Sequence, residues 1–251
     1  MTRHLSILTG ASRGMGLSMA RQLLTDGHTV LCISRTEQPT LAQHAQLAGA
    51  TLLQWCHDLA DCSSFVIRLQ DWLREQGSAD WRSATLINNA GVIAGIVPLS
   101  QADANDLARS LRVGLEAPML LTAAFLRATE GWTAERKVLN ISSGLGRRPM
   151  ASQAAYCAAK AGMDHFTRCL ALEEAQKTNG AKVCSLAPGV IDTDMQLQLR
   201  SADAANFPDR DSFARLKSRG QLASADEAAR RVLACLSRPD FGGQPVADVR
   251  D

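Results

Sequence analysis

The sequence predicts a single α/β domain, built as a doubly wound parallel sheet of about seven strands with helices on both faces. Short apolar runs alternate with helix-length segments along all 251 residues, and such alternation is typical of βαβ units. Apolar residues make up 46% of the chain but aromatic residues only 4%. The core must therefore consist of Ala, Leu, Val and Ile, as in a sheet buried between helices. Because no repeat or low-complexity linker interrupts the pattern, we expect one domain over residues 1–251.

The expected strands are the short apolar runs. They are Leu5–Thr9, Thr29–Ser34, Thr51–Cys56, Ala84–Asn88, Val138–Ser142, Lys182–Leu186 and a last one near Pro245–Val249. Helices are expected between them, at roughly Met15–Asp26, Thr40–Ala48, Ser63–Gln76, Ala102–Thr129, Ala154–Lys177 and Ala225–Ser237. Residues Thr193–Gly220 form an insertion before the last helix, in which Pro, Asp and Arg are mixed with apolar residues such as Met195 and Phe207. This composition suits a mobile cover over a substrate site.

Composition and charge argue against several classes of function. The net charge is only +2 with both signs interspersed, so we expect no nucleic-acid partner. The seven cysteines are scattered without a Cys-x-x-Cys pair, which favours reduced thiols in the cytoplasm, and the five histidines show no metal-binding spacing. No apolar run approaches the ~20 residues that span a bilayer. Met1–Leu8 leads directly into a strand, so we expect no signal peptide and no membrane partner.

A glycine-rich loop follows the first expected strand. It reads Thr9-Gly10-Ala11-Ser12-Arg13-Gly14-Met15-Gly16 and is followed by an expected helix. Glycines let the backbone approach a pyrophosphate, and the N-terminus of a helix offers N–H groups and partial positive charge to it. The strand before and the helix after the loop favour a dinucleotide site over a tight turn that binds nothing.

The end of the second strand indicates which dinucleotide is bound. Folds of this kind that bind NAD usually carry an acid there for the ribose 2′-hydroxyl, whereas this chain has Ser34-Arg35, with Arg13 nearby in the loop. Two guanidinium groups can hold a 2′-phosphate in a forked geometry. We therefore expect NADP(H) rather than NAD(H); Glu37, beyond the strand, is the residue that could reverse this preference.

The chain contains one tyrosine, Tyr156, and Lys160 follows it by four residues. On a helix, residues four apart share a face. A nearby cation lowers the pKa of a phenol from about 10 and makes it a better proton donor near neutral pH. Such pairs also arise by chance, and on this ground alone Tyr156 could pack in the core while Lys160 is solvated.

With its motifs in this order, the chain resembles the short-chain dehydrogenase/reductase family over essentially its full length, which implies a Rossmann-type fold. The matching segments are Thr9–Gly16, His57-Asp58-Leu59, Asn88-Asn89-Ala90-Gly91, Ser143 thirteen residues before Tyr156, and Pro188–Thr193. Together, the residues and the resemblance assign cofactor binding to Gly10, Ser12, Arg13, Gly14, Met15, Gly16, Arg35, Asp58, Leu59, Asn89, Ala90, Gly91, Tyr156, Lys160, Pro188, Gly189, Val190, Ile191, Thr193 and Met195.

The resemblance also implies the catalytic roles. Ser143 would hydrogen-bond the carbonyl oxygen, Tyr156 would deliver the proton, and Lys160 would lower the pKa of the tyrosine and hold the nicotinamide ribose. Ser142 is the rival for the serine role. Because strand neighbours point to opposite faces, only one of the two can serve, and the spacing selects Ser143.

The chain departs from the family at Gly114, where asparagine is usual. That asparagine is thought to hold a water that links the lysine to solvent. We expect a slower or rewired proton relay with reduction retained, and a water in the vacated space could restore the link.

The C-terminal third resembles sepiapterin reductases and the related bacterial benzil reductases, in Ala187–Gln196, Leu216–Gly220 and Val246–Asp251. This implies reduction of one carbonyl of a small vicinal dicarbonyl, with substrate contacts from Ser143, Tyr156, Gly189 and Asp248. Asp248 stands where sepiapterin-type enzymes anchor a pterin, although it could equally be a surface carboxylate near a frayed end. Arg147-Arg148 could attract an acidic substrate, but we expect a solvated pair.

Two alternatives to this function stay open. One is a general alcohol or 3-oxoacyl reductase of the same family, and the other is a protein that senses NADP(H) without turnover. Gly114 is the only residue that favours the sensor. The family commonly forms homodimers or homotetramers through the two long helices, expected here at Ala102–Thr129 and Ala154–Lys177.

Overall fold

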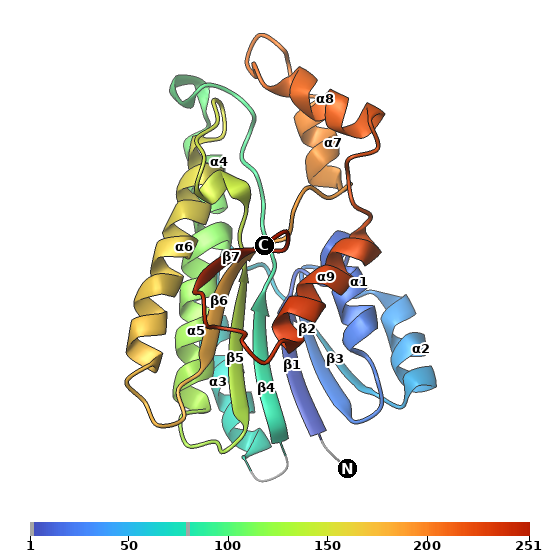
Figure 1. Ribbon diagram of the computed structural model, residues 1–251, viewed down its shortest axis with the longest axis vertical. Coiled ribbons are helices and arrows are strands. Elements are labelled where there is room, and N and C mark those ends of the chain that lie inside the picture. Colours follow the sequence, from blue (N-terminus) through green and yellow to red (C-terminus); the bar gives the residue numbers. More distant parts are fainter. Residues whose placement is uncertain (1–2, 79–80) are drawn as a thin grey trace.

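The computed structural model describes residues 3–78 and 81–251 and contains one seven-stranded parallel sheet (Figure 1). The strands are β1 Arg3–Thr9, β2 His28–Ser34, β3 Thr51–Cys56, β4 Trp81–Asn88, β5 Glu135–Ile141, β6 Lys182–Ala187 and β7 Val246–Asp248. Their order is β3-β2-β1-β4-β5-β6-β7. The predicted strands and the doubly wound fold are thus confirmed, with strand ends that differ by a few residues. Successive strands are added outward from β1 on one side and from β4 on the other. Folds of this class open a ligand cleft at the point where the strand order reverses in this way.

Helices cover both faces of the sheet (Figure 1). One layer holds α1 Gly14–Leu23, α2 Pro39–Ala48 and α9 Ala225–Ser237; the other holds α3 Phe65–Gln76, α4 Ala104–Leu111, α5 Ala117–Ala128 and α6 Ala154–Glu174. Two apolar cores result. Met19 and Val232 are fully buried in the first, and Leu69 and Phe125 in the second. None of the described helices combines the length and apolarity needed to cross a membrane.

The long helix predicted over Ala102–Thr129 is interrupted. α4 ends at Leu111, a π-helical turn spans Arg112–Glu116, and α5 begins at Ala117. Pro118 explains the break, because it has no N–H to donate to the carbonyl of Gly114 and its ring crowds that carbonyl. The wider turn accommodates the proline where a regular helix would not. Gly114, the position that departs from the family, therefore lies inside a helix irregularity.

The insertion at 193–220 is folded rather than extended. It contains the short helices α7 Asp194–Arg200 and α8 Arg210–Ser218. Phe207 is fully buried between them with Leu199 and Phe213, and this small cluster packs against Ile93 and Met150 from elsewhere in the chain. In Figure 1, α7 and α8 stand apart from the two helix layers, beyond one end of the sheet.

Candidate active site

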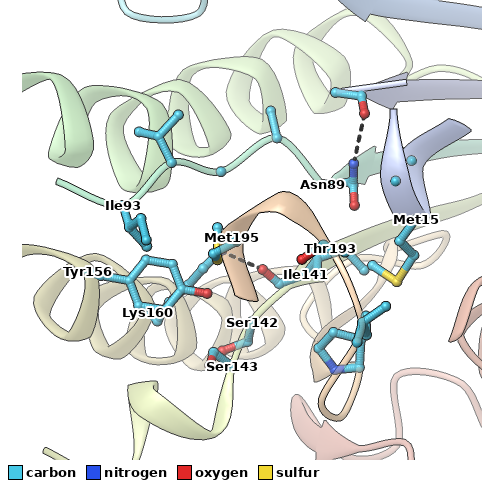
Figure 2. A pocket seen from close by; sticks show the side chains of 18 of the residues that line it. Met15, Asn89, Ile93, Ile141, Ser142, Ser143, Tyr156, Lys160, Thr193 and Met195 are labelled. Atoms are coloured by element: carbon cyan, nitrogen blue, oxygen red, sulfur yellow. Dashed lines mark hydrogen bonds between the residues drawn. The ribbon is translucent and has the colours of Figure 1, made fainter. Parts of the chain in front are cut away.

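A cleft of about 810 Å³ lies at the carboxyl ends of the central strands, and every residue that the sequence assigned to cofactor, reacting group or substrate lines it. These residues come from segments as far apart as Gly10 and Asp248. Figure 2 shows Met15 and Asn89 toward one part of this cleft and Ser143, Tyr156 and Lys160 toward another. The fold therefore assembles the predicted residues around one space.

The glycine loop is packed tightly against the end of β4. A Cβ on Gly16 would lie 2.1 Å from the carbonyl oxygen of Gly10, and one on Gly10 would lie 2.9 Å from Cα of Ala90. The Asn89 side-chain amide donates to the carbonyl of Thr9 at 2.9 Å, which ties the two segments together. α1 begins at Gly14 with no side-chain cap. Its first N–H groups are left to bind an anion in the cleft.

Cationic side chains line the same end of the cleft. Arg35 forms no ion pair with any described residue, whereas Arg13 pairs with Asp194 of α7 at 3.1 Å. Arg109 of α4 donates to Asp58 at 2.8 Å. Burial opposes it, but the backbone N–H of Ala60 and the Arg109 guanidinium lower the pKa of Asp58. Sequence reasoning did not identify Arg109, because its partner is 51 residues away and no local motif joins them.

Tyr156 and Lys160 lie on one face of α6, as their spacing predicts. The Lys160 ammonium is 5.7 Å from the centroid of the Tyr156 ring and donates to the carbonyl of Ile141 at 2.7 Å. Burial raises the pKa of Tyr156, and the hydrogen bond with Ser143 only partly opposes this rise. Burial also lowers the pKa of Lys160 to about 8, against the attraction of Asp164. The expected lowering of the tyrosine pKa by Lys160 is thus not seen, because loss of solvent outweighs the hydrogen bond with Ser143.

The two adjacent serines make different contacts. Ser142 is buried and its hydroxyl donates to Asp164 at 2.5 Å. The Ser143 hydroxyl accepts from the N–H of Leu145 at 3.2 Å and hydrogen-bonds Tyr156. Only Ser143 is therefore placed beside the phenol.

Gly114 is buried where the π-turn passes α6. A Cβ at this position would lie 3.0 Å from Cβ of Ala159, which precedes Lys160. No other atom outside its own helix lies within 4 Å of that point in the described part of the chain. A side chain at this position would therefore press on α6 on one side and meet little on the others.

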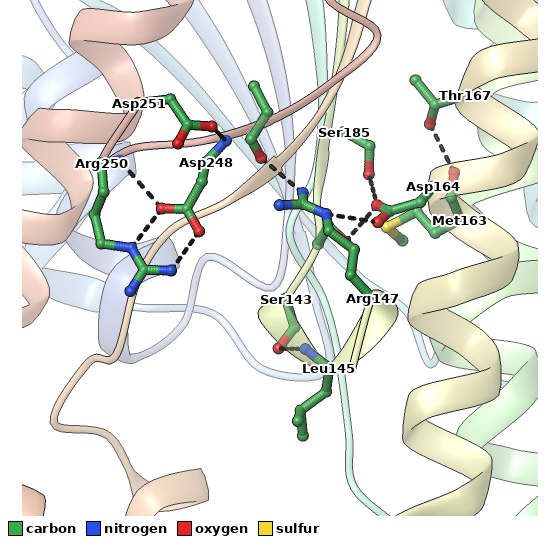
Figure 3. A network of polar contacts seen from close by, with 12 residues as sticks. Ser143, Leu145, Arg147, Met163, Asp164, Thr167, Ser185, Asp248, Arg250 and Asp251 are labelled. Atoms are coloured by element: carbon green, nitrogen blue, oxygen red, sulfur yellow. Dashed lines mark hydrogen bonds and ion pairs between the residues drawn. The ribbon is translucent and has the colours of Figure 1, made fainter. Parts of the chain in front are cut away.

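The residues after Ser143 and at the C-terminus differ from expectation. Arg147 is not simply solvated: it pairs with buried Asp164 at 3.2 Å and donates to the carbonyl of Ala247 at 2.8 Å (Figure 3). Arg148 is exposed, as expected. The Asp248 carboxylate, only 8% exposed, accepts from Nε and Nη2 of Arg250 at 2.7 and 2.6 Å. Arg250 therefore already binds the carboxylate that the sequence predicts as the anchor of a pterin.

Comparison with known proteins agrees with this geometry. The model of the short chain dehydrogenase family matches residues 5–204. The benzil reductase ((S)-benzoin forming) of Bacillus cereus is 35% identical over 235 residues, which cover 94% of each chain. The enzyme of the same name from Bacillus subtilis (strain 168) is 32% identical over 99% of each chain. The sepiapterin reductase of Xenopus tropicalis is 31% identical over 91% of this chain and 89% of its own.

Solved structures extend the likeness to the whole fold. A short-chain dehydrogenase/reductase from Burkholderia vietnamiensis is 33% identical, with a TM-score of 0.66 over 99% of this chain and 98% of its own. A metagenomic short-chain oxidoreductase in complex with NADP is 25% identical, with a TM-score of 0.73 over 98% and 95%. A 3-oxoacyl-[acyl-carrier protein] reductase from Brucella melitensis in complex with NAD is similar in fold alone, at 22% identity and a TM-score of 0.81 over 99% and 96%.

Proposed function

The chain belongs to the short-chain dehydrogenase/reductase family, and from this we propose that it is an NADPH-dependent reductase of one carbonyl of a small vicinal dicarbonyl. Membership makes it an oxidoreductase that acts on carbonyl or hydroxyl groups with a nicotinamide cofactor. The observation that most supports the proposal is the meeting of Ser143, Tyr156 and Lys160 in the cleft that also contains the glycine loop.

The groups at the loop end of the cleft fit a dinucleotide that carries an extra phosphate. The uncapped start of α1 suits the pyrophosphate. At the end of β2 the Ser34 hydroxyl accepts from the N–H of Ala11 at 2.8 Å, so the side chain left for the ribose is Arg35 rather than a carboxylate. Arg13 would join it after release from Asp194. This charge pattern supports NADP(H) over NAD(H).

When bound, a nicotinamide would supply a hydride to the carbonyl carbon, and the protein would stabilise and protonate the carbonyl oxygen. The Ser143 hydroxyl donates to that oxygen as negative charge grows on it. Tyr156 holds its proton at neutral pH, because burial raises its pKa, and it gives that proton to the same oxygen. Lys160, oriented by the carbonyl of Ile141, favours the phenolate that results.

The substrate end of the cleft favours an apolar dicarbonyl over a pterin. Apolar side chains from three parts of the chain line the cleft: Ile93, Leu145, Met195, Leu199 and Phe213. An amino-pyrimidine ring could reach the Asp248 carboxylate only by displacing Arg250 from its two-point contact. We therefore place a benzil-like diketone first and a sepiapterin-like substrate second.

The insertion at 193–220 acts in this proposal as the cover of the cleft. Its first residues lie over the glycine loop, since the Thr193 methyl group is 3.7 Å from the point where a Cβ on Gly14 would be. Leu199 and Phe213 present its apolar cluster to the same space. The contact between Arg13 and Asp194 joins cover and loop, so binding of the cofactor phosphates and closure of the cover would compete for Arg13.

A panel of carbonyl compounds tests the function. Oxidation of NADPH would be followed with benzil, sepiapterin, a simple ketone and a 3-oxoacyl thioester, with and without Arg250→Ala. We expect benzil to be reduced fastest, and the variant to gain activity on sepiapterin but not on benzil. Fastest reduction of the thioester would support the general reductase instead. If the protein binds NADPH but oxidises it with no compound of the panel, the result would support a protein that senses NADP(H) without turnover.

We also propose a homodimer or homotetramer in the cytoplasm. Exposed apolar side chains lie on the outer helices, with Met119 of α5 at 42% and Leu172 of α6 at 71% exposure. Burying such side chains between copies removes apolar surface from water. The free cysteines, three of them buried, suit a reducing compartment. Light scattering of the purified protein with and without Leu172→Glu tests the assembly, and an unchanged mass in the variant would exclude this surface.

A further inference from the structure

Asp164 lies one helical turn beyond Lys160 on α6, and only 2% of it is exposed. Its carboxylate accepts three side-chain hydrogen bonds (Figure 3). Ser142 and Ser185 donate to Oδ1 at 2.5 and 2.7 Å, and Nε of Arg147 donates to Oδ2 at 3.2 Å. Neither the spacing of the motifs nor the reaction described above uses this residue.

Two of these donors, Ser142 and Arg147, belong to the loop that carries Ser143. Ser142 is its immediate neighbour, and Arg147 follows the 3₁₀ turn Gly144–Gly146. The turn packs so closely against α6 that it has no room for a side chain. A Cβ added to Gly146 would lie 2.9 Å from the carbonyl oxygen of Lys160 and 3.1 Å from Oδ2 of Asp164. The Asp164 carboxylate thus binds the loop on both sides of Ser143, while Ser185 joins it to β6.

Asp164 also balances a buried charge. The Lys160 ammonium is 3% exposed and has no carboxylate within 4 Å among the described residues; its nearest polar contact is the carbonyl of Ile141. A buried cation without an anion in reach loses its proton readily. The Asp164 carboxylate counteracts this, because its attraction opposes the lowering of the Lys160 pKa by burial.

Few other ionisable groups act on this pair. Tyr156 lies on the same helix, Arg147 faces Asp164 from the loop, and Cys184 of β6 lies close enough to Asp164 and Arg147 for their charges to act on it. Burial raises the pKa of Cys184 to about 12, so it is neutral. β5 presents the backbone carbonyl of Ile141, and the turn after β4 and the π-turn present glycines.

We propose that Asp164 is a positioning residue of the active site, which fixes the loop that carries Ser143 and supplies the negative charge that balances the Lys160 ammonium. The kinetic part of this inference rests on the proposed reductase function. The electrostatic part does not, because it concerns the protein without substrate or cofactor.

The titration of Lys160 tests the inference directly. The chain has five lysines, so their side-chain NMR signals can be followed against pH, with Lys160 assigned by its loss in Lys160→Arg. Asp164→Asn keeps the shape of the side chain and removes the charge, and we expect the Lys160 pKa to fall by about one unit. Ser185→Ala removes one hydrogen bond to the same carboxylate and should leave this pKa unchanged. An unchanged Lys160 titration in Asp164→Asn would overturn the inference.

A second variant covers the case in which Asp164→Asn does not fold. Arg147→Met removes a cation beside Asp164 from a side chain that is 34% exposed, and it should raise the Lys160 pKa. No shift, or a shift in the same direction as Asp164→Asn, would contradict the inference. In turnover, the alkaline limb of the kcat profile should move with the measured pKa in each variant. If the wild-type protein reduces no carbonyl compound, the proposed function fails while the titration still decides the role of Asp164.

Discussion

Burial sets the protonation of the two central side chains of the site. Removing a group from water penalises its charged form, which raises the pKa of Tyr156 and lowers that of Lys160 to about 8. The first effect keeps the proton on the phenol at neutral pH, and the second brings the Lys160 ammonium closer to losing its own proton. In the proposed reduction, the phenol would give up its proton only when a stronger base, the developing alkoxide, is next to it, and the lysine would then stabilise the phenolate. Access to solvent therefore matters as much as the choice of residues.

The first prediction concerns Tyr156. Tyr156→Phe keeps the ring and its packing but removes the proton donor, so kcat should fall by about 10²–10⁴-fold. NADPH binding, followed by quenching of tryptophan fluorescence, should change less than about threefold, because the ring is retained. Near-normal turnover would exclude Tyr156 as the donor.

The second prediction concerns Arg35 and the choice of cofactor. Arg35→Ser removes the cation that follows β2 and has no ion-pair partner among the described residues, so kcat/KM for NADPH should fall by about 10–100-fold, as expected for a lost charged hydrogen bond. The value for NADH should hardly change, since NADH has no 2′-phosphate. Arg230→Ser, on the exposed face of α9, is the matched control. Equal losses with both cofactors would count against a 2′-phosphate contact.

Among the elements, the helix from α4 to α5 shows how one proline reshapes a site. Pro118 forces the π-turn, and this turn brings the backbone of Gly114 against Ala159 of the catalytic helix. The usual asparagine could not take this position without pushing α6. The glycine and the irregular turn therefore belong together, and we expect a proton relay to Lys160 that does not use an asparagine at this position.

The third prediction tests this relation. Gly114→Asn should lower the melting temperature by a few degrees, because its Cβ would crowd Ala159 at 3.0 Å. Ala159→Gly in the same chain should relieve the crowding, with Ala159→Gly alone as the control. Turnover and its pH profile are then compared at similar stability. If they match the wild-type values, the position has no part in proton supply.

For the molecule as a whole, the sheet order brings the site together. β1 and β4 lie side by side at the centre, which places the glycine loop next to Asn89 and Ala90. β6 and β7 bring Gly189 and Asp248 to the other side of the same cleft. Leu199 and Phe213 of the insertion line the same cleft, beyond the carboxyl ends of the strands. Buried polar groups such as Lys160 affect both the stability of the fold and the proposed reaction, so stability and activity are expected to be coupled.

The fourth prediction follows from this coupling. Lys160 has a pKa of about 8 in the fold and an ordinary value of 10.5 when unfolded. Between these values the unfolded chain binds a proton that the fold has lost, so this residue makes the free energy of unfolding rise with pH. Buried thiols such as Cys32, whose pKa burial raises to about 12, act in the opposite sense above pH 9.

The difference between two proteins isolates the lysine. Urea unfolding of the wild-type protein and of Lys160→Met would be compared from pH 7 to 10. The stability advantage of Lys160→Met should shrink as pH rises through about 8. A constant difference over this range would mean that Lys160 is not a buried cation.

Local signals in the sequence determined most of the fold. Each strand has its own apolar run, so the seven strands and the parallel α/β architecture could be predicted, whereas the short helices α7 and α8 of the insertion were not. The glycine loop and the tyrosine–lysine spacing are equally local, because the chemistry depends on residues within one turn or one helix face. The break before Pro118 was not predicted. A proline inside a helical pattern indicates a kink, but it does not indicate that the irregularity is a π-turn.

The tertiary structure alone decided how polar side chains are paired across the cleft. Arg109 with Asp58, Arg147 with Asp164 and the occupation of Asp248 by Arg250 depend on which groups are buried together and in what direction they point. The same holds for the protonation of Tyr156 and Lys160, which burial controls. Pattern and spacing in the sequence encode where the backbone runs. The pKa of an ionisable side chain depends instead on its exposure to solvent and on its partners, and these are set only when distant segments of the chain come together.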